Sequence, residues 1–465
     1  MRTIHAGIRP VEIAVFAALA LLFASLKVLE HVGFRTNDFD TGIYSNVAWN
    51  IAHGRGFYSS VLERNHLGEH FSPIMAIFAP LYRIHASAII LLVSQALAVA
   101  ATFVLLRKLF AVLLCELPRT VADRISAALL VLFFLYEPVA SALYFEFHPS
   151  TLGMPLVAGA LLFLHRGSDR GLWISVALLL LTKEIAIATT FGLAIYAGAV
   201  LRRWRMATAL FLVAVGAGAL VFQWIMPAFR EGPWGHMGRL APSSHLLEKL
   251  TYLLRLLVPL GLLPAFGWRA LLAAVPTTAV NLSVGFEQQF SLHYHYDDQN
   301  CVFWIAAAAH GARVLAPRLL AVAGAWGARL RVAVPLAMLV VALAMTGRTP
   351  IGQMRRWWPS PERQVLRERL AAYVDLPAEV AIATQEALGP HLSHRYHYRR
   401  LNTGDFLDPP FEEGELIVLT RHAFRGRLKW REVQRALASD SRFEVVEKDA
   451  YLEVYRWRES AAPDG

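Results

Sequence analysis

The sequence holds several clusters of polar residues whose types could carry out chemistry. Asp38 and Asp40 lie two residues apart, just past the first apolar run of the chain. A partly buried carboxylate at this place could accept a proton or hold a cation, whereas a helix cap or a solvated acidic turn would need no function. Glu69 and His70 form a second pair. This pair could contact a metal ion or a phosphate, or it could simply cap a helix.

Two further clusters lie in short connections between apolar runs. The segment FEFHP at 145–149 places Glu146 and His148 in a very tight turn, where charged residues need a partner or a function to offset their desolvation. We favour a function for this turn. Lys183 and Glu184 interrupt another apolar stretch. They could neutralise each other, or the lysine could stabilise a phosphate leaving group from an outward-facing cavity.

A fifth cluster is HYHYDD at 293–298. His293 and His295 alternate as metal ligands on a strand would, but no third ligand has a fixed spacing to them. An aromatic belt at the membrane surface is the simpler interpretation. Polar and aromatic residues that follow Asp40 at helical spacing predict an amphipathic helix at the membrane interface. These residues are Tyr44, Asn46, Trp49 and Asn50.

The composition indicates which elements must position these clusters. Of the 465 residues, 56% are hydrophobic and only 17% are charged, and the mean hydropathy is +0.43. A chain this apolar needs lipid as its solvent, and in lipid its apolar runs must be helical. We predict an all-α membrane bundle of about eleven spans. The spans are expected near 13–29, 87–106, 125–144, 151–165, 171–182, 185–200, 207–227, 251–266, 270–285, 300–316 and 332–346.

The distribution of charge predicts the orientation of the chain. A net charge of +10 could suggest nucleic acid as a partner, but the basic residues gather in alternate short loops, which indicates membrane topology instead. The N-terminus is therefore expected in the cytoplasm, and all five polar clusters are expected outside it. This scheme requires a break at Lys183 and Glu184, because a single span over 171–200 would place Arg202 and Arg203 outside.

The C-terminal part of the chain differs from the rest. We expect residues 1–347 to form the transmembrane domain, with a large outer loop at 30–86, and residues 348–465 to form a small extracytoplasmic α/β domain. The two cysteines, Cys115 and Cys301, suggest neither a disulfide nor a cysteine metal site. In the C-terminal domain, period-two and amphipathic patterns predict strands at 380–384, 415–420 and 443–457, and helices at 362–373 and 429–438.

Several motifs resemble a family of prokaryotic predicted membrane proteins over nearly the whole chain. The motifs are FDTGIYSNVAWNIAHGRGFYSS, GEHFSPI, FEFHP, TKEIAI, HYHY and ALGPHLSHR. That family in turn resembles the GT-C glycosyltransferases, multi-helix enzymes that use polyprenyl-phosphate sugars. The resemblance implies an essential acid in the first outer loop, which assigns this role to Asp40 with Asp38 as its neighbour. The sequence departs from the motifs at Ser45, Asn46, Glu69, Glu146 and Ile185, where other residues are common; Ser45 and Ile185 lack the usual acid and are poor candidates.

The resemblance predicts an enzyme of the inner (plasma) membrane. It would transfer a sugar, with inversion, from a polyprenyl-phosphate donor to an extracytoplasmic acceptor. Lys183, His148 and His70 are candidates to stabilise the leaving phosphate, and Glu184, His293 and His295 complete the predicted binding residues. A divalent metal among Asp40, Glu69, His70, Glu146 and His148 is an option that the spacing does not require. The alternatives are a membrane transporter and a non-enzymatic envelope protein that serves binding or assembly.

Overall fold

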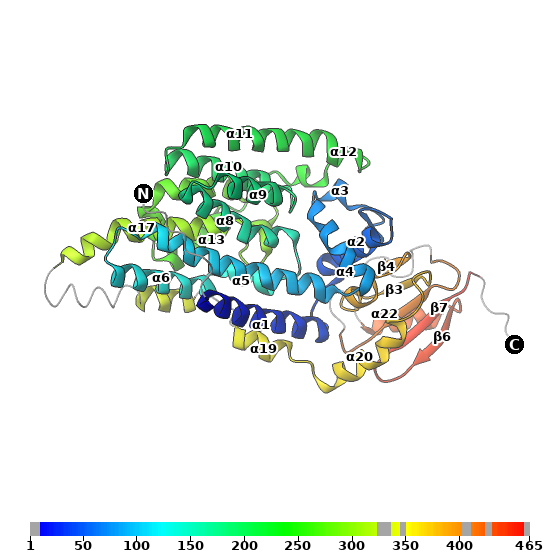
Figure 1. The fold of residues 1–465 in the computed structure, drawn as a ribbon. Helices are drawn as coiled ribbons and strands as arrows, with labels where there is room; N and C mark the ends of the chain where they lie inside the picture. Colours follow the sequence, from blue (N-terminus) through cyan, green and yellow to red (C-terminus); the bar gives the residue numbers. More distant parts are fainter. Residues whose placement is uncertain (1–9, 323–335, 345–349, 402–410, 424–429, 460–465) are drawn as a thin grey trace.

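The computed structural model describes residues 10–322, 336–344, 350–401, 411–423 and 430–459. Figure 1 shows a bundle of long helices beside a smaller domain that contains a sheet, with residues 38–84 between the two. The bundle consists of α1 (Pro10–Val32), α5 (Ala88–Leu113), α6 (Arg119–Leu135), α7 (Glu137–Tyr144), α8 (Gly153–Arg166), α9 (Asp169–Leu180), α10 (Ile185–Ala199), α11 (Trp204–Ala219), α12 (Met226–Ala228), α13 (Leu246–Leu257), α14 (Leu263–Phe266), α15 (Trp268–Leu271), α16 (Val275–Leu282) and α17 (Asn300–Ala321).

Most of the predicted helices are present, but the number of spans is not confirmed. Within the described residues, three helices are long and apolar enough to cross a membrane by themselves: α1, α5 and the continuous stretch Trp204–Ala228. A fourth candidate is the pair α6 and α7, which is bent by 51°. Other helices are shorter, with 14, 12 and 15 residues in α8, α9 and α10. A full span needs about 20 residues, so length and composition alone do not identify these as spans.

The predicted break at Lys183 and Glu184 is confirmed. Helix α9 ends at Leu180, and α10 begins at Ile185. In contrast, the continuous helices predicted at 251–266 and 270–285 are wrong, because this region is divided among α13–α16 and short 3₁₀ turns. Prolines stand at the start of several of these pieces, and Gly261 adopts φ 63° between two of them. Proline cannot continue a helix without the loss of a hydrogen bond. The prediction considered only the apolar content of 251–285, so its helices were too long.

The helix predicted at 332–346 lies partly outside the described residues. Its described portion, 336–344, is helical.

The first loop folds into short elements that cover the end of the bundle. These are η1 (Asp38–Gly42), a single π turn, then α2 (Ile43–Ala52), β1 (Tyr58–Ser59), β2 (Arg64–Asn65), α3 (His66–Glu69), η2 (Pro73–Phe78) and α4 (Ala79–Ile84). The predicted helix after Asp40 is present as α2, but its interfacial position is wrong. Every residue from Ile43 to Asn50 is buried, because Tyr44 and Trp49 pack in a cluster with Phe147 and Tyr82.

The C-terminal domain is a mixed sheet with helices on both faces. The strand order is β4-β3-β5-β7-β6; β4, β3 and β5 are parallel, and β5, β7 and β6 are antiparallel. The strand predicted over 443–457 is in fact a hairpin of two strands. The elements are α19 (Pro350–Trp357), α20 (Pro361–Val374), β3 (Ile382–Thr384), α21 (Gly389–Leu392), β4 (Tyr398–Arg400), β5 (Leu416–Leu419), α22 (Trp430–Ser439), β6 (Phe443–Lys448) and β7 (Glu453–Trp457).

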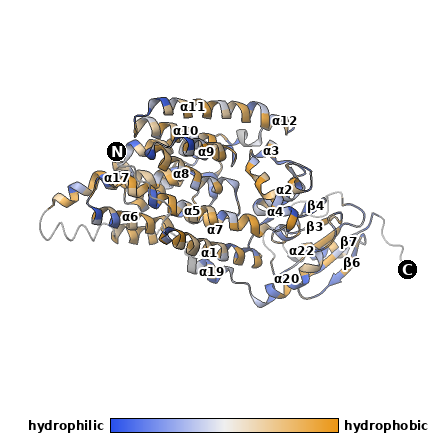
Figure 2. Cartoon of the chain, viewed as in Figure 1, coloured by the Kyte–Doolittle hydropathy of each residue, from blue (hydrophilic) through white to orange (hydrophobic). Residues whose placement is uncertain are grey.

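Separate hydrophobic cores hold these parts together. One large core joins the bundle helices. In the C-terminal domain, α20 packs Leu366 and Leu370 on one face of the sheet, and α22 packs Val433 and Leu437 on the other. Figure 2 shows hydrophobic residues along the bundle helices and more hydrophilic residues around α20, β6 and β7. The fold thus combines a lipid-compatible bundle with a water-compatible domain.

Candidate active site

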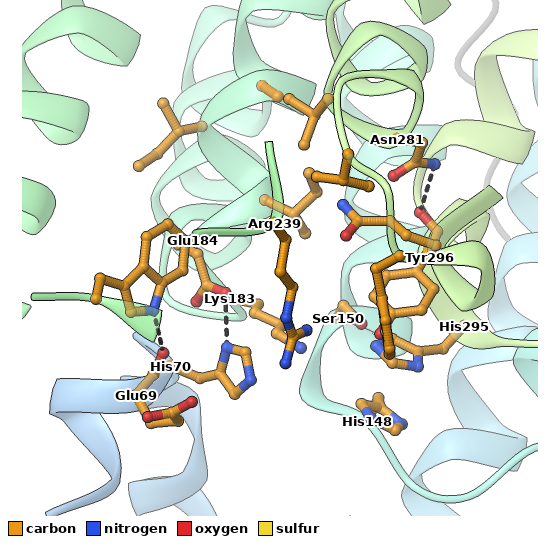
Figure 3. Close-up of a pocket in the computed structure, with 18 of the residues that line it drawn as sticks. Glu69, His70, His148, Ser150, Lys183, Glu184, Arg239, Asn281, His295 and Tyr296 are labelled. Atoms are coloured by element: carbon orange, nitrogen blue, oxygen red, sulfur yellow. Dashed lines mark hydrogen bonds and ion pairs between the residues drawn. The ribbon is translucent and has the colours of Figure 1, made fainter. Parts of the chain in front are cut away.

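A cavity of about 820 Å³ lies where the first loop meets the ends of several bundle helices. Its lining combines charged side chains with an apolar wall (Figure 3). Seven of the ten predicted site residues line it: Asp40, Glu69, His70, His148, Lys183, Glu184 and His295. Residues from all five sequence clusters therefore meet at one place.

Asp40 lies in the π turn η1, directly after the first helix. The side chain of Asn37 caps this turn by accepting a hydrogen bond from the Phe39 backbone N–H, at 2.8 Å. The Asp40 carboxylate oxygen Oδ1 lies 3.3 Å from Nε2 of His148, and the aspartate side chain is 23% exposed. The other nitrogen of the imidazole, Nδ1, lies 3.3 Å from the Glu146 carbonyl oxygen. Both ring nitrogens of His148 thus face oxygen atoms, an arrangement that orients the ring toward Asp40.

Lys183 and Glu184 occupy the break between α9 and α10. Glu184 accepts a hydrogen bond from the Phe71 backbone N–H at 2.9 Å and pairs with Nδ1 of His70 at 2.8 Å. Burial opposes ionisation of Glu184, but His70 and Lys183 outweigh it and lower the pKa of the carboxyl. Within the described chain, the Lys183 ammonium forms no hydrogen bond or ion pair, although the residue is only 6% exposed. It is therefore available to an anion in the cavity.

Arg239 brings a second cation to the cavity. It ends the 3₁₀ turn η5 (Gly235–Arg239), and its guanidinium lies 4.4 Å from the centre of the Phe286 ring. Figure 3 shows Arg239 and Lys183 both reaching into the cavity. Two cations on different elements suit a phosphate group, which accepts hydrogen bonds on several oxygens.

Three predicted site residues lie outside the cavity lining. Asp38 is buried against the C-terminal domain, where the Tyr398 hydroxyl donates to its carboxylate at 3.1 Å. Arg400 lies 4.0 Å away. Glu146 is buried too, and its carboxylate accepts a hydrogen bond from the Thr41 hydroxyl. Burial raises the pKa of Asp38 to about 8, and it raises the pKa of Glu146 to about 8 as well. Both carboxyls support the π turn rather than the cavity.

His293 is the third, and it does not line the cavity that His295 lines. His293 is 56% exposed, and its Nδ1 lies 3.5 Å from Glu137. His295 belongs to a 3₁₀ turn, η9 (His295–Asp297), and stacks on His148 with 3.3 Å between the ring centres. A 3₁₀ turn does not alternate its side chains as a strand does, so the two rings diverge. In the part of the chain that the structure covers, no three His, Cys, Asp or Glu side chains are grouped to hold a metal ion.

Glu69 remains at the rim of the cavity. Its carboxylate lies 3.8 Å from Arg64 and is 33% exposed, and its carbonyl oxygen accepts a hydrogen bond from the Trp234 indole. The rest of the wall is apolar. Its residues come from α10, from the π turn η4 (Leu220–Ile225) and from α16 and the segment after it; they include Ile187, Phe191, Phe222, Pro276, Val280 and Val284.

Sequence reasoning missed several polar residues of this cavity. His66, Ser150, Arg239 and Asn281 line it. His66 and Ser150 stand beside the Glu69–His70 pair and the FEFHP turn, and these clusters were usable signals for them. Asp298 lies at its edge, where it accepts hydrogen bonds from the hydroxyls of Ser150 at 2.7 Å and Thr151 at 3.0 Å. The HYHYDD motif was a usable signal for Asp298. Arg239 offered none, because a lone arginine in a connector is ordinary.

Comparisons with known proteins agree with this fold. The sequence profile of a family described as predicted membrane protein (DUF2079) matches residues 30–449. Two crystal structures of ArnT from Cupriavidus metallidurans, one bound to undecaprenyl phosphate and one in the apo state, are similar in structure, each with a TM-score of 0.57 and 14% sequence identity. Each match covers 97% of this chain and 99% of the other. No curated protein matches in sequence.

Proposed function

The chain belongs to the DUF2079 family of predicted membrane proteins, and we propose that it is a membrane glycosyltransferase of the GT-C type. It would transfer a sugar from a polyprenyl-phosphate donor to an acceptor outside the cytoplasm. The fold supports this proposal, because ArnT is a GT-C glycosyltransferase and one of its structures holds undecaprenyl phosphate. Fold alone does not establish an activity, so the argument rests on the cavity.

One observation carries the proposal. A single cavity is lined by a carboxylate, Asp40, by two cations, Lys183 and Arg239, and by an apolar wall. A polyprenyl-phosphate sugar has the matching parts. Its phosphate pairs with the cations, its lipid chain lies along the apolar wall, and its sugar faces the carboxylate. Each of these contacts follows from charge or hydrophobic complementarity.

The reaction then needs one base and charge stabilisation. An acceptor hydroxyl attacks the anomeric carbon, its oxygen forms the new bond to that carbon, and Asp40 takes the hydroxyl proton. The bond between the anomeric carbon and the phosphate oxygen breaks, and its electron pair leaves with the polyprenyl phosphate. Lys183 and Arg239 stabilise the negative charge that develops there. Attack from the face opposite the phosphate inverts the configuration of the sugar.

The proposal includes the arrangement of the protein in the membrane. Residues 1–347 would form the transmembrane domain and residues 348–465 an extracytoplasmic domain, in the inner (plasma) membrane of the cell. The N-terminus would lie in the cytoplasm, as the positive-inside bias predicts. The cavity would then open on the side where the acceptor is found.

A transfer assay with reconstituted protein tests the proposal. Radiolabelled polyprenyl-phosphate sugars of several types would be offered together with total envelope acceptors, with and without divalent cations. We expect transfer by the wild type and a loss of about 100- to 10,000-fold in Asp40→Asn, because the amide cannot accept the proton and base catalysis contributes 10²–10⁴-fold. Asp123→Asn is the matched control, since Asp123 is 76% exposed and distant in sequence from the cavity residues.

Two results would contradict the proposal. Full transfer by Asp40→Asn would remove Asp40 from the mechanism. An absence of transfer, together with no binding of any polyprenyl-phosphate lipid by the wild type, would favour transport or envelope assembly instead.

A further inference from the structure

Three neutral side chains in the cavity carry buried polar atoms without a hydrogen-bond partner in the described residues. His66 is 1% exposed, His295 is 7% exposed and Asn281 is fully buried. Within the described residues, no partner exists for either ring nitrogen of His66, for either ring nitrogen of His295, or for Oδ1 of Asn281. All three residues line the cavity. Figure 3 shows His295 beside His148 and Asn281 on the same side of the cavity.

Unpartnered polar atoms are rare in protein interiors, because each one loses its hydrogen bonds to water without replacement. Five such atoms around one cavity therefore indicate a ligand that supplies the missing bonds. Because the residues that carry these atoms line the cavity, we expect the atoms to contact the polar part of the ligand.

The charge state of the histidines narrows the class of ligand. Burial, with smaller effects from His70 and Lys183, lowers the pKa of His66 to about 3. Burial, followed by His148 and Lys183, also lowers the pKa of His295. Both rings are therefore neutral, with one N–H donor and one nitrogen acceptor each. A hydroxyl group also donates and accepts, so hydroxyls match these rings better than a second anion or cation would.

The position of these residues relative to Lys183 fits a sugar. Lys183 lines the same cavity as His66 and His295. A sugar attached to a phosphate at Lys183 would reach them. Aromatic rings flank both histidines: Tyr44 lies 5.0 Å from His66 and Tyr296 lies 4.4 Å from His295, measured between ring centres. Aromatic side chains offer an apolar surface to the carbon faces of a sugar ring.

We propose that His66, His295 and Asn281 form the subsite that binds the hydroxyl groups of the donor sugar. This inference rests on the proposed function, since it names the part of the donor that these residues recognise. The phosphate is assigned to Lys183 and Arg239 and the proton transfer to Asp40, so the three residues supply recognition only.

Binding measurements on the full chain in lipid nanodiscs test the subsite. The probes are undecaprenyl phosphate and a panel of undecaprenyl-phosphate sugars that carry a hexose, a pentose or an aminopentose. We expect at least one glycosylated lipid to bind the wild type about 10-fold or more tightly than undecaprenyl phosphate. His66→Phe and His295→Phe should each reduce that preference about fivefold, the effect of roughly one lost hydrogen bond, and leave the affinity for undecaprenyl phosphate unchanged. His293→Phe is the matched control.

The outcomes separate this inference from the proposed function. If undecaprenyl phosphate binds but no sugar increases its affinity, the subsite is wrong and the phosphate site stands. If undecaprenyl phosphate itself does not bind, the proposed function fails. Should a phenylalanine variant not fold, His66→Leu and His295→Leu decide the matter. A reduced preference for the glycosylated lipid supports the subsite, and an unchanged preference contradicts it.

Discussion

Asp38 and Asp40 are two residues apart, yet the fold gives their carboxyls different environments. Asp40 faces the cavity and His148. Asp38 faces the C-terminal domain and is fully buried beside Tyr398. Arg400 and the Tyr398 hydroxyl favour the ionised form of Asp38, but burial outweighs them and raises its pKa to about 8. One aspartate is thus available for chemistry, and the other holds the turn in place.

The raised pKa of Asp38 predicts a pH dependence of stability. Between about pH 4 and pH 8, the folded protein keeps the proton of Asp38 while the unfolded chain has lost it, so the free energy of unfolding falls as pH rises through this window. The contribution is at most about 1.4 kcal/mol per pH unit. Asp38→Asn removes it, and its melting temperature should fall less steeply from pH 5 to pH 8 than that of the wild type.

Thermal unfolding in detergent at several pH values measures this difference. Burial also raises the pKa of Glu146, and this affects the wild type and Asp38→Asn alike. Only the difference between their curves of melting temperature against pH therefore reports on Asp38. Asp123→Asn should follow the wild type, because its side chain is exposed. Parallel curves for Asp38→Asn and the wild type would show that Asp38 is ionised in the fold.

At the scale of elements, the segment that contains α21, from Glu386 to His394, contacts the π turn and α2. His394 bonds to the Ser45 hydroxyl at 2.7 Å, and the Ser393 carbonyl oxygen accepts a hydrogen bond from Asn46 at 2.6 Å. The backbone N–H of Asp38 donates to the Glu386 carbonyl oxygen at 3.0 Å. These contacts flank Asp40 on both sides along the chain. The C-terminal domain therefore fixes the position of the proposed base.

Gly389 allows this close contact and provides a test of it. A Cβ atom at Gly389 would lie closer than 3.0 Å to the Cβ of Asp38 and to the Tyr398 hydroxyl oxygen. Gly389→Ala should therefore lower the free energy of unfolding by about 1–3 kcal/mol, the usual effect of overpacking. It should also reduce transfer by displacing the π turn.

Gly216→Ala is the control for this substitution. Gly216 lies in α11, where an added Cβ meets no atom within 4 Å, and alanine favours a helix over glycine. Melting temperature and transfer would be measured for both variants. Equal stability of Gly389→Ala and Gly216→Ala would mean that the two domains are not held together by this contact.

At the scale of the whole molecule, function depends on which side of the membrane the cavity faces. The break between α9 and α10 places Lys183 at the same end of the bundle as the first loop and the turn that carries His148. The number of spans decides which loops share a side of the membrane, and the charge bias of those loops then predicts the orientation.

Cysteine labelling determines the orientation directly. Cys115 is exposed in the connection after α5, and we expect a membrane-impermeant maleimide to label it only after the membrane is opened. A Cys115→Ala chain that carries Ser439→Cys in α22 should be labelled in intact cells, because the C-terminal domain is expected outside. Cys301 is buried and serves as an unreactive background. The reverse pattern would place the cavity in the cytoplasm and exclude an extracytoplasmic acceptor.

Local patterns in the sequence were enough to predict several features of this protein. Hydropathy identified a membrane protein, and the loop charges required the break at Lys183 and Glu184 that separates α9 from α10. Periodicity predicted α20, α22, β3 and β5 close to their observed bounds. Hydropathy, loop charge and periodicity depend only on residues that are neighbours in the sequence. These features can therefore be predicted from a single sequence.

The tertiary structure alone decided which polar residues share a site. Asp38 meets Tyr398, which lies 360 positions further along the chain, and no local pattern predicts that contact. The same is true of Arg239, whose surroundings in the sequence are ordinary. The interfacial position predicted for α2 was wrong for a similar reason: an amphipathic pattern shows that a helix has an apolar face but does not show whether lipid or protein covers it.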